Sequence, residues 1–186
     1  MRKWSAFAIG KLDKQRAITL SVIACWVILI NGIAIALNMP VKWPISMSGI
    51  FYFALGGTPD KAPHVFLGGC LGIGFACLLV FLTQLGAPYI GRYVSTMIPL
   101  AIMIFSIIVF GPVIPFLFNR ATFAFMTISC INTSILHANA LLYIAVFLIG
   151  GGITVGGYIL WLHLLKRHFE KKAALAEQGD SSPSST

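Results

Sequence analysis

Charge is scarce in this chain, and negative charge is the scarcest. Asp and Glu number 5 and Lys and Arg 13, so 10% of the 186 residues are charged, whereas a soluble domain carries roughly a quarter. Hydrophobic residues make up 58%, the mean hydropathy is +0.91, and several separate apolar runs follow one another. One such run would suit a signal peptide, but several predict an all-α polytopic membrane protein.

None of the five acidic residues falls within an apolar run. Proton- and sodium-coupled transporters usually hold a carboxylate within the bilayer, and cation channels often have a ring of carboxylates. The sequence therefore favours a passive route over active coupling or cation conduction. The five residues are Asp13, Asp60, Glu170, Glu177 and Asp180.

Familiar catalytic and metal-binding motifs are absent from the sequence. It contains no CxxC, HExxH or GxSxG motif and no phosphate-binding glycine loop. The four cysteines lie in apolar segments without the spacing of metal ligands, which predicts free, buried thiols. They are Cys25, Cys70, Cys77 and Cys130. We expect no metal, no cofactor and no enzymatic step.

The net charge of +8 does not indicate nucleic-acid binding, because the cations gather at the two ends of the chain. Lys and Arg collect on the cytoplasmic flank of membrane helices. Residues 1–16 and 166–186 are therefore predicted to be cytoplasmic, which requires an even number of crossings. The same clusters should attract anionic lipid headgroups. They are Arg2, Lys3, Lys11, Lys14 and Arg16, and Lys166, Arg167, Lys171 and Lys172.

Six transmembrane helices are predicted, and two of them are short or interrupted. The segment SMSGIFYFALGG, residues 46–57, is apolar for about a dozen residues, whereas a spanning helix needs roughly 20. The region 112–131 is either one kinked helix or a shorter helix that starts after Arg120. The polar tail 173–186 is expected to be disordered. Long helices are expected at 17–39, 64–85 (ended by Gly86 and Pro88), 94–110 and 138–165.

The second half of the chain has a pattern similar to that of the first. Helices 1–4 are expected within 17–110. The first repeat is expected at 17–87 and the second at 88–165. Each half has a long helix, an interrupted helix and a glycine-rich long helix. Three crossings per repeat would invert the second copy, a 3+3 plan found in many transporters and channels. The alternative is six unrelated helices. Glycines four residues apart should allow close helix packing, and we expect them to contribute to a homo-oligomer as well. The pairs are Gly68 and Gly72, and Gly152 and Gly156.

The two interrupted segments contain the candidate solute pathway. Ends of half-length helices are tolerated inside a membrane only where protein or water covers them. Phenylalanines two residues apart could form constrictions with one member of each pair, although packing in the core or against lipid is the commoner role. The candidates are Ser46, Ser48, Phe51, Phe53, Arg120, Phe123, Phe125 and Thr127.

Arg120 is the most informative single residue among them. In a kinked helix it would lie near mid-membrane, where arginine is costly and usually functional; at a helix start it would only flank the membrane. Lys42 stands in the same relation to the first short segment, and a cation at a helix N-terminus favours anions. His64 and His137 could gate the route by titration or could simply cap helices.

The stretch from Trp43 to Pro88 resembles a bacterial inner-membrane family known as domain of unknown function 1097. The likeness lies in FYFALGG, in the helix that ends in LGAP, in Pro115 and residues 122–124, and in the long final helix with its basic end. More distantly, the chain is similar to the six-helix membrane halves of fusaric-acid-resistance-type exporters of organic anions. The resemblance implies six helices and a bacterial inner (plasma) membrane location, without a substrate.

Together these features predict a channel or passive transporter for a small solute, with a lean towards a small anion. One alternative is a channel for a small neutral solute such as urea or ammonia. Another is a non-transporting membrane subunit that binds a partner or lipid.

Overall fold

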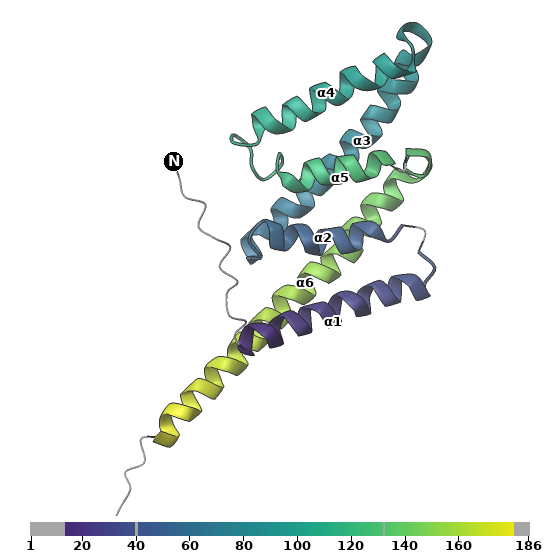
Figure 1. The fold of residues 1–186 in the computed structure, drawn as a ribbon. Helices are drawn as coiled ribbons and strands as arrows, with labels where there is room; N and C mark the ends of the chain where they lie inside the picture. Colours follow the sequence, from purple (N-terminus) through teal and green to yellow (C-terminus); the bar gives the residue numbers. More distant parts are fainter. Residues whose placement is uncertain (1–13, 40, 132, 181–186) are drawn as a thin grey trace, which may run out of the picture.

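The computed structural model describes residues 14–39, 41–131 and 133–180, and the side chains within 17–39, 41–131 and 139–171. All regular elements in these ranges are helical, which confirms the all-α class (Figure 1). The described elements are α1 (Lys14–Ala36), α2 (Trp43–Ala54), the 3-10 turn η1 (Pro59–Lys61), α3 (Ala62–Ile90), α4 (Arg92–Phe110), α5 (Arg120–Ile131) and α6 (Thr133–Asp180).

Four helical stretches in the described part are long and apolar enough to cross a membrane: 17–36, 59–90, 92–110 and 139–171. The chain is therefore a multi-pass membrane protein by helix length and composition. The helices α2 and α5 have 12 residues each. At 1.5 Å per residue each is ~18 Å long, well short of the ~30 Å hydrocarbon core.

Four helices form one layer, in the order α1, α2, α5, α4, and the two remaining helices cross this layer obliquely (Figure 1). Helix α3 packs against α4 and α5, whereas α6 packs against α1 and α2. Each oblique helix thus packs against two helices from the other half of the chain. Helix α1 begins and α6 ends on the same side of the molecule (Figure 1).

Helix α2 starts at Trp43, earlier than the predicted Ser46. Pro44 lies in its first turn, where a missing N–H costs nothing because the first turn has no intrahelical acceptor for it. The helix ends at two glycines with positive φ, Gly56 at 117° and Gly57 at 67°. Their N–H groups donate to the carbonyl groups of Phe53 and Tyr52, both at 3.0 Å. The breakers at both ends therefore set the short length of this helix.

The prediction that α3 ends at Gly86 and Pro88 is wrong. The helix contains Pro88 and continues to Ile90, and it stops at Gly91, whose φ is 78°. The N–H of Gly91 donates to the carbonyl of Ala87 at 3.1 Å. Because Pro88 lies in the last turns, its missing donor removes one hydrogen bond near the helix end and does not break the helix.

The alternative of one kinked helix from Pro112 to Ile131 is also wrong. Turns occupy 111–119, and α5 begins at Arg120. Asn119 is the N-cap: its Oδ1 accepts the N–H groups of Ala121 at 2.8 Å and Thr122 at 3.3 Å. Arg120 is therefore the exposed first residue of a short helix, and not the middle residue of a long one.

Helix α6 extends beyond its predicted end at Leu165. It is interrupted at Asn139 (φ −139°, ψ 35°), close to the predicted start, and then continues to Asp180. The expected disorder of the tail is thus wrong for 173–180, while 181–186 lie outside the described residues, as do 1–13.

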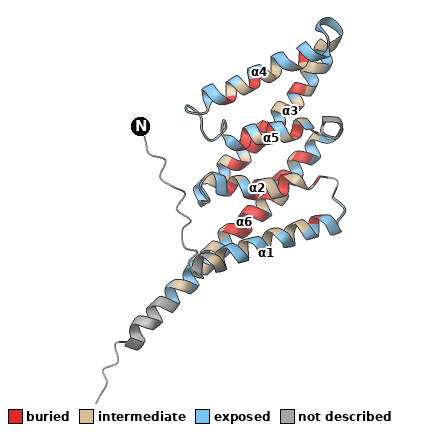
Figure 2. Cartoon of the chain, viewed as in Figure 1, coloured by how far each residue is buried: buried red, intermediate tan, exposed pale blue. Residues whose placement is uncertain are grey.

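Buried residues concentrate where the short helices meet α3 and α6 (Figure 2). The largest fully buried side chains include Tyr52, Phe125, Tyr143 and Phe147. By contrast, only 6% of the spanning part of α1 and 17% of that of α4 are buried. The two outer helices therefore present most of their surface to the surroundings, and the two short helices lie at the centre.

Candidate functional site

The short helices α2 and α5 are buried in the same pattern. In each 12-residue helix, the buried residues are the second, third, sixth, seventh and tenth. Both helices therefore turn the same face towards the oblique helices. The residues are Pro44, Ile45, Ser48, Gly49 and Tyr52 in α2, and Ala121, Thr122, Phe125, Met126 and Ser129 in α5.

Helix α5 lies on glycines of α3. A Cβ on Gly68 would be 2.7 Å from Asn119 Nδ2 and 2.8 Å from Thr122 Oγ1. A Cβ on Gly72 would collide with the carbonyl oxygen of Thr122 and lie 2.9 Å from the amide nitrogen of Met126. Because backbone atoms cannot move aside as a side chain can, Gly72 sets the distance between α3 and α5.

Helix α2 lies on glycines of α6 in a matching way. A Cβ on Gly150 would be 2.7 Å from Ile45 Cγ1, and one on Gly151 would be 2.9 Å from Ser48 Cβ. Ile45 and Ser48 are the third and sixth residues of α2, just as Thr122 and Phe125 are of α5. Each short helix is thus seated on glycines of the oblique helix from the other half.

The glycines of α6 that pack against other helices are not the predicted pair. A Cβ on Gly152 or Gly156 would meet no atom of the described chain within 4 Å. These two residues lie on the other side of the helix from Gly151 and Gly157, and Gly157 contacts the indole ring of Trp26. Within this protomer, therefore, the Gly152 and Gly156 prediction is wrong, while Gly68 and Gly72 do lie at a helix contact.

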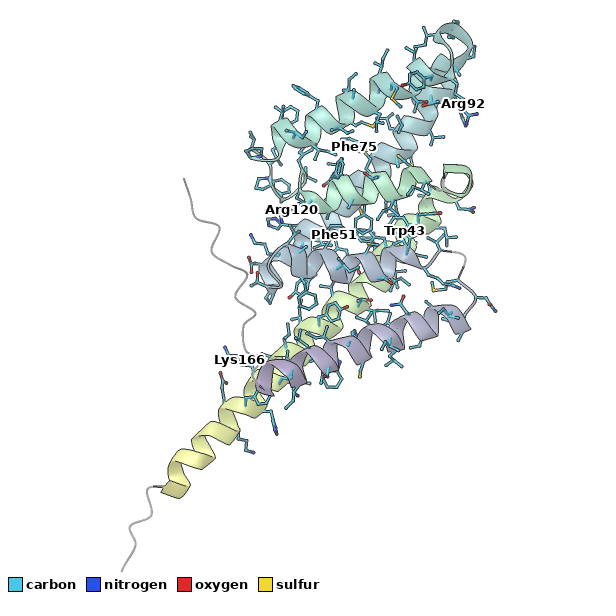
Figure 3. The ribbon with its side chains drawn as sticks, in the orientation of Figure 1. Trp43, Phe51, Phe75, Arg92, Arg120 and Lys166 are labelled. Atoms are coloured by element: carbon cyan, nitrogen blue, oxygen red, sulfur yellow. The ribbon has the colours of Figure 1, made fainter. Side chains whose placement is uncertain are left out.

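Helices α2 and α5 meet through aromatic rings (Figure 3). The ring of Phe125 is 5.5 Å from that of Trp43, 5.9 Å from that of Phe51 and 4.5 Å from that of Phe147. Phe125 is 0% exposed. We call the contact of Trp43 and Phe51 with Phe125 the α2–α5 seam, and these rings close it in this structure.

The other member of each phenylalanine pair points away from the seam. Phe53 is 40% exposed and Phe123 is 45% exposed. This division follows from the spacing of two residues, which turns neighbouring members to different helix faces. The structure therefore brings Phe51 and Phe125 together and separates Phe53 and Phe123 from them.

The three candidate hydroxyl groups, and that of Thr122, already donate to nearby protein oxygens. Ser48 donates to the carbonyl of Ile45 at 2.6 Å, and the exposed Thr127 to that of Phe123 at 2.8 Å. Ser46 donates to Asn31 Oδ1 at 2.7 Å, which ties α2 to α1. Thr122 donates to the carbonyl of Leu117 and so helps to close the turn before α5. These contacts give the hydroxyls structural roles in this conformation.

Two other buried hydroxyls have no hydrogen-bond partner among the described residues. They belong to Tyr52 and Ser129, both 0% exposed. Each is the tenth residue of its short helix, so the two occupy matching places. Unpaired buried polar groups are rare, and each one requires an explanation. Tyr52 is the residue that the sequence pattern missed, because a tyrosine in an apolar run is usually a packing or interfacial residue.

The cations at the N-termini of the two short helices lie on opposite sides of the molecule. Lys42 is the N-cap residue of α2 and Arg120 is the first residue of α5. Helices α2 and α5 run in opposite directions, so Trp43 and Arg120 mark opposite sides of the molecule (Figure 3). Each short helix therefore begins with a positive charge at the positive end of its own dipole.

The first turn of α3 is hydrogen-bonded to the start of α5. The side-chain amide of Asn119 donates to the carbonyl of the half-buried His64 at 2.9 Å. In the 3-10 turn before α3, the carboxylate of Asp60 forms an ion pair with the ammonium group of Lys61 at 3.9 Å. The side chain of His137 lies outside the described residues, so its proposed gating role stays a prediction.

These features define an all-helical, multi-pass membrane protein with two half-length helices at its centre. Comparison with known proteins finds no matching family model, no matching curated protein and no matching solved structure. The resemblance to the domain of unknown function 1097 family and to the exporters therefore stays a prediction.

Proposed function

We propose that this protein is a passive channel or facilitator for a small anion, built as an inverted 3+3 repeat, with its route along the α2–α5 seam. The observation that carries the proposal is the matched burial of two antiparallel half-length helices, each seated on glycines of the other half. Paired short helices at equivalent positions of two repeats are where transporter folds place their solute sites.

The crossing of the two oblique helices supports the inverted repeat. A Cβ on Gly69 of α3 would meet the ring of Phe147 of α6, and one on Gly151 of α6 would lie 3.3 Å from the ring of Phe66 of α3. The rings of Phe66 and Phe147 are 5.4 Å apart. Such reciprocal contacts are those that a two-fold axis through the crossing would produce.

The charge distribution favours an anion. Both short helices have a cation at the N-terminus, and these two N-termini lie at opposite mouths of the seam. An anion approaching from either side therefore meets a positive side chain and a positive helix end. Between Lys61 and Phe169 the sequence has no carboxylate that would repel it.

The unpaired hydroxyls of Tyr52 and Ser129 could donate to the solute inside the protein. Because Phe125 is fully buried, this conformation corresponds to a closed seam, and conduction requires the rings of Phe51 and Phe125 to separate. The aromatic lining and the hydroxyls also suit a small neutral solute such as urea or ammonia, which is the second candidate.

The positive-inside rule gives the proposed orientation. Helices α3 and α5 begin, and α6 ends, on the side where α1 begins (Figure 1). Most of the cations whose side chains are described belong to that side, which we assign to the cytoplasm. They are Lys61, Arg120, Lys166, Arg167 and Lys171, against Lys42 and Arg92 on the other side. The bacterial inner membrane location rests on the family resemblance alone.

Solute flux into proteoliposomes tests the proposed function. Stopped-flow uptake of chloride, nitrate and formate is compared with that of urea, with protein-free vesicles as the control. We expect protein-dependent anion uptake that exceeds urea uptake. Urea uptake alone would support the neutral-solute candidate, and no uptake of either would favour a non-transporting membrane subunit.

A further inference from the structure

An apolar groove lies between the end of α3 and the start of α4, away from the α2–α5 seam. It has a volume of about 410 Å³, within the roughly 300–1,000 Å³ range of small-molecule sites. The side chains along it are exposed to the surroundings: Leu85 is 60% exposed and Ile98 is 51% exposed. Its lining includes Leu82, Leu85, Tyr89, Ile90, Ile98 and Pro99.

The hydroxyl groups of Thr83 and Ser95 near the groove are paired within the protein. Pro99 cannot donate to the carbonyl of Ser95 as a helical residue would, and the hydroxyl of Thr83 approaches that carbonyl at 3.4 Å instead. The Ser95 hydroxyl donates to the carbonyl of Gly91 at 2.9 Å. A polar solute would therefore find few free partners in the groove, whereas an alkyl chain would need none.

The end of the groove at the α3–α4 turn is positively charged. Arg92, the first residue of α4, lies at this turn and forms no ion pair with any described residue (Figure 3). The N-cap residue is Gly91, so no side chain caps the first N–H groups of α4, and such helix starts bind phosphate. Tyr89 and Tyr93, 85% and 76% exposed, are residues typical of the membrane–water interface.

We propose that this groove binds an anionic phospholipid, with one acyl chain along the apolar lining and the phosphate at Arg92 and the N-terminus of α4. The positive charge of Arg92, with no carboxylate near it among the described side chains, favours an anionic headgroup over a zwitterionic one. The only acidic residue at either end of α3 is Asp60, and it lies at the far end of this 29-residue helix, ~43 Å away. The proposal is independent of whether the seam conducts a solute.

Lipid retention measured by native mass spectrometry tests this site. The purified protein is equilibrated with equal amounts of phosphatidylglycerol and phosphatidylethanolamine of the same acyl chains. We expect a preference for phosphatidylglycerol that falls about fivefold in Arg92→Gln and is retained in Arg92→Lys. The matched control is Lys61→Gln, which removes a cation that is paired with Asp60 at the far end of α3 and should leave the preference unchanged.

The groove itself is tested by filling it. Ile98→Trp adds bulk to the groove, and Ile108→Trp adds the same bulk to α4 at a site outside the groove that is 68% exposed. We expect only Ile98→Trp to reduce the amount of lipid retained, with both variants eluting as folded protein in size-exclusion chromatography. An unchanged lipid preference in Arg92→Gln, or equal loss in both tryptophan variants, would mean non-specific surrounding lipid and would overturn the proposal.

Discussion

Gly72→Ala should weaken the docking of α5 on α3 more than any other single methyl group added in the core. The new Cβ would collide with the carbonyl oxygen of Thr122 and lie 2.9 Å from the amide nitrogen of Met126. Both are backbone atoms, so α5 as a whole must move away from α3. Overpacking of this kind costs about 1–3 kcal/mol. Thermal unfolding in detergent, followed by size-exclusion chromatography, should show a lower Tm.

Gly74→Ala is the matched control for this substitution. It adds the same methyl group to the same helix, at a position where a Cβ meets no described atom within 4 Å. Since alanine is the better helix former by about 1 kcal/mol, the Tm should stay equal or rise. Equal Tm values for the two variants would contradict the close approach of α3 and α5.

Anion uptake should fall about tenfold or more when both Lys42 and Arg120 are replaced by Gln. Each side chain lies at the N-terminus of a short helix, at one of the two mouths of the proposed route. Charged mouths raise the local concentration of the oppositely charged solute and its rate of entry by roughly 10–1,000-fold. The loss should be greater at low ionic strength, because salt screens exposed charges.

Two comparisons separate this effect from a general loss of protein. Lys171→Gln removes an exposed cation on the distal part of α6 and should leave anion uptake unchanged. Urea uptake in the Lys42→Gln, Arg120→Gln double variant should also stay as it is. If anion uptake survives the double substitution, the two cations merely flank the membrane and the lean towards an anion is wrong.

The short length of α2 could be predicted from the sequence because its limits are local. Pro44 at the start, and Gly56 and Gly57 at the end, act through their own backbone preferences. The start of α5 has a similar local signal, an asparagine N-cap at position 119. The apolar run before it, which contains two prolines, made this signal hard to recognise. Pro88 misled the prediction because a proline near a helix end does not have to end the helix.

Which glycines pack could not be predicted from their spacing. Helix α6 has five glycines between positions 150 and 157, and these fit more than one helix face. The buried face is chosen by the tertiary contacts of Ile45, Ser48 and Trp26 with α6, which join residues far apart in the sequence. The same holds for Tyr52 and Ser129, whose matching positions emerge only once the two short helices are compared in space.

The central claim, conduction along the α2–α5 seam, is tested most directly by reversibly linking the two sides of the seam. Phe51→Cys and Phe125→Cys are combined in a chain whose native cysteines are replaced by alanine, since their rings are 5.9 Å apart. A short bis-methanethiosulfonate reagent joins the two thiols, and dithiothreitol releases them. We expect anion uptake to stop on linking and to return on release, while each single-cysteine variant conducts throughout. Uptake that continues at full rate in the linked protein would show that the solute does not pass through the seam.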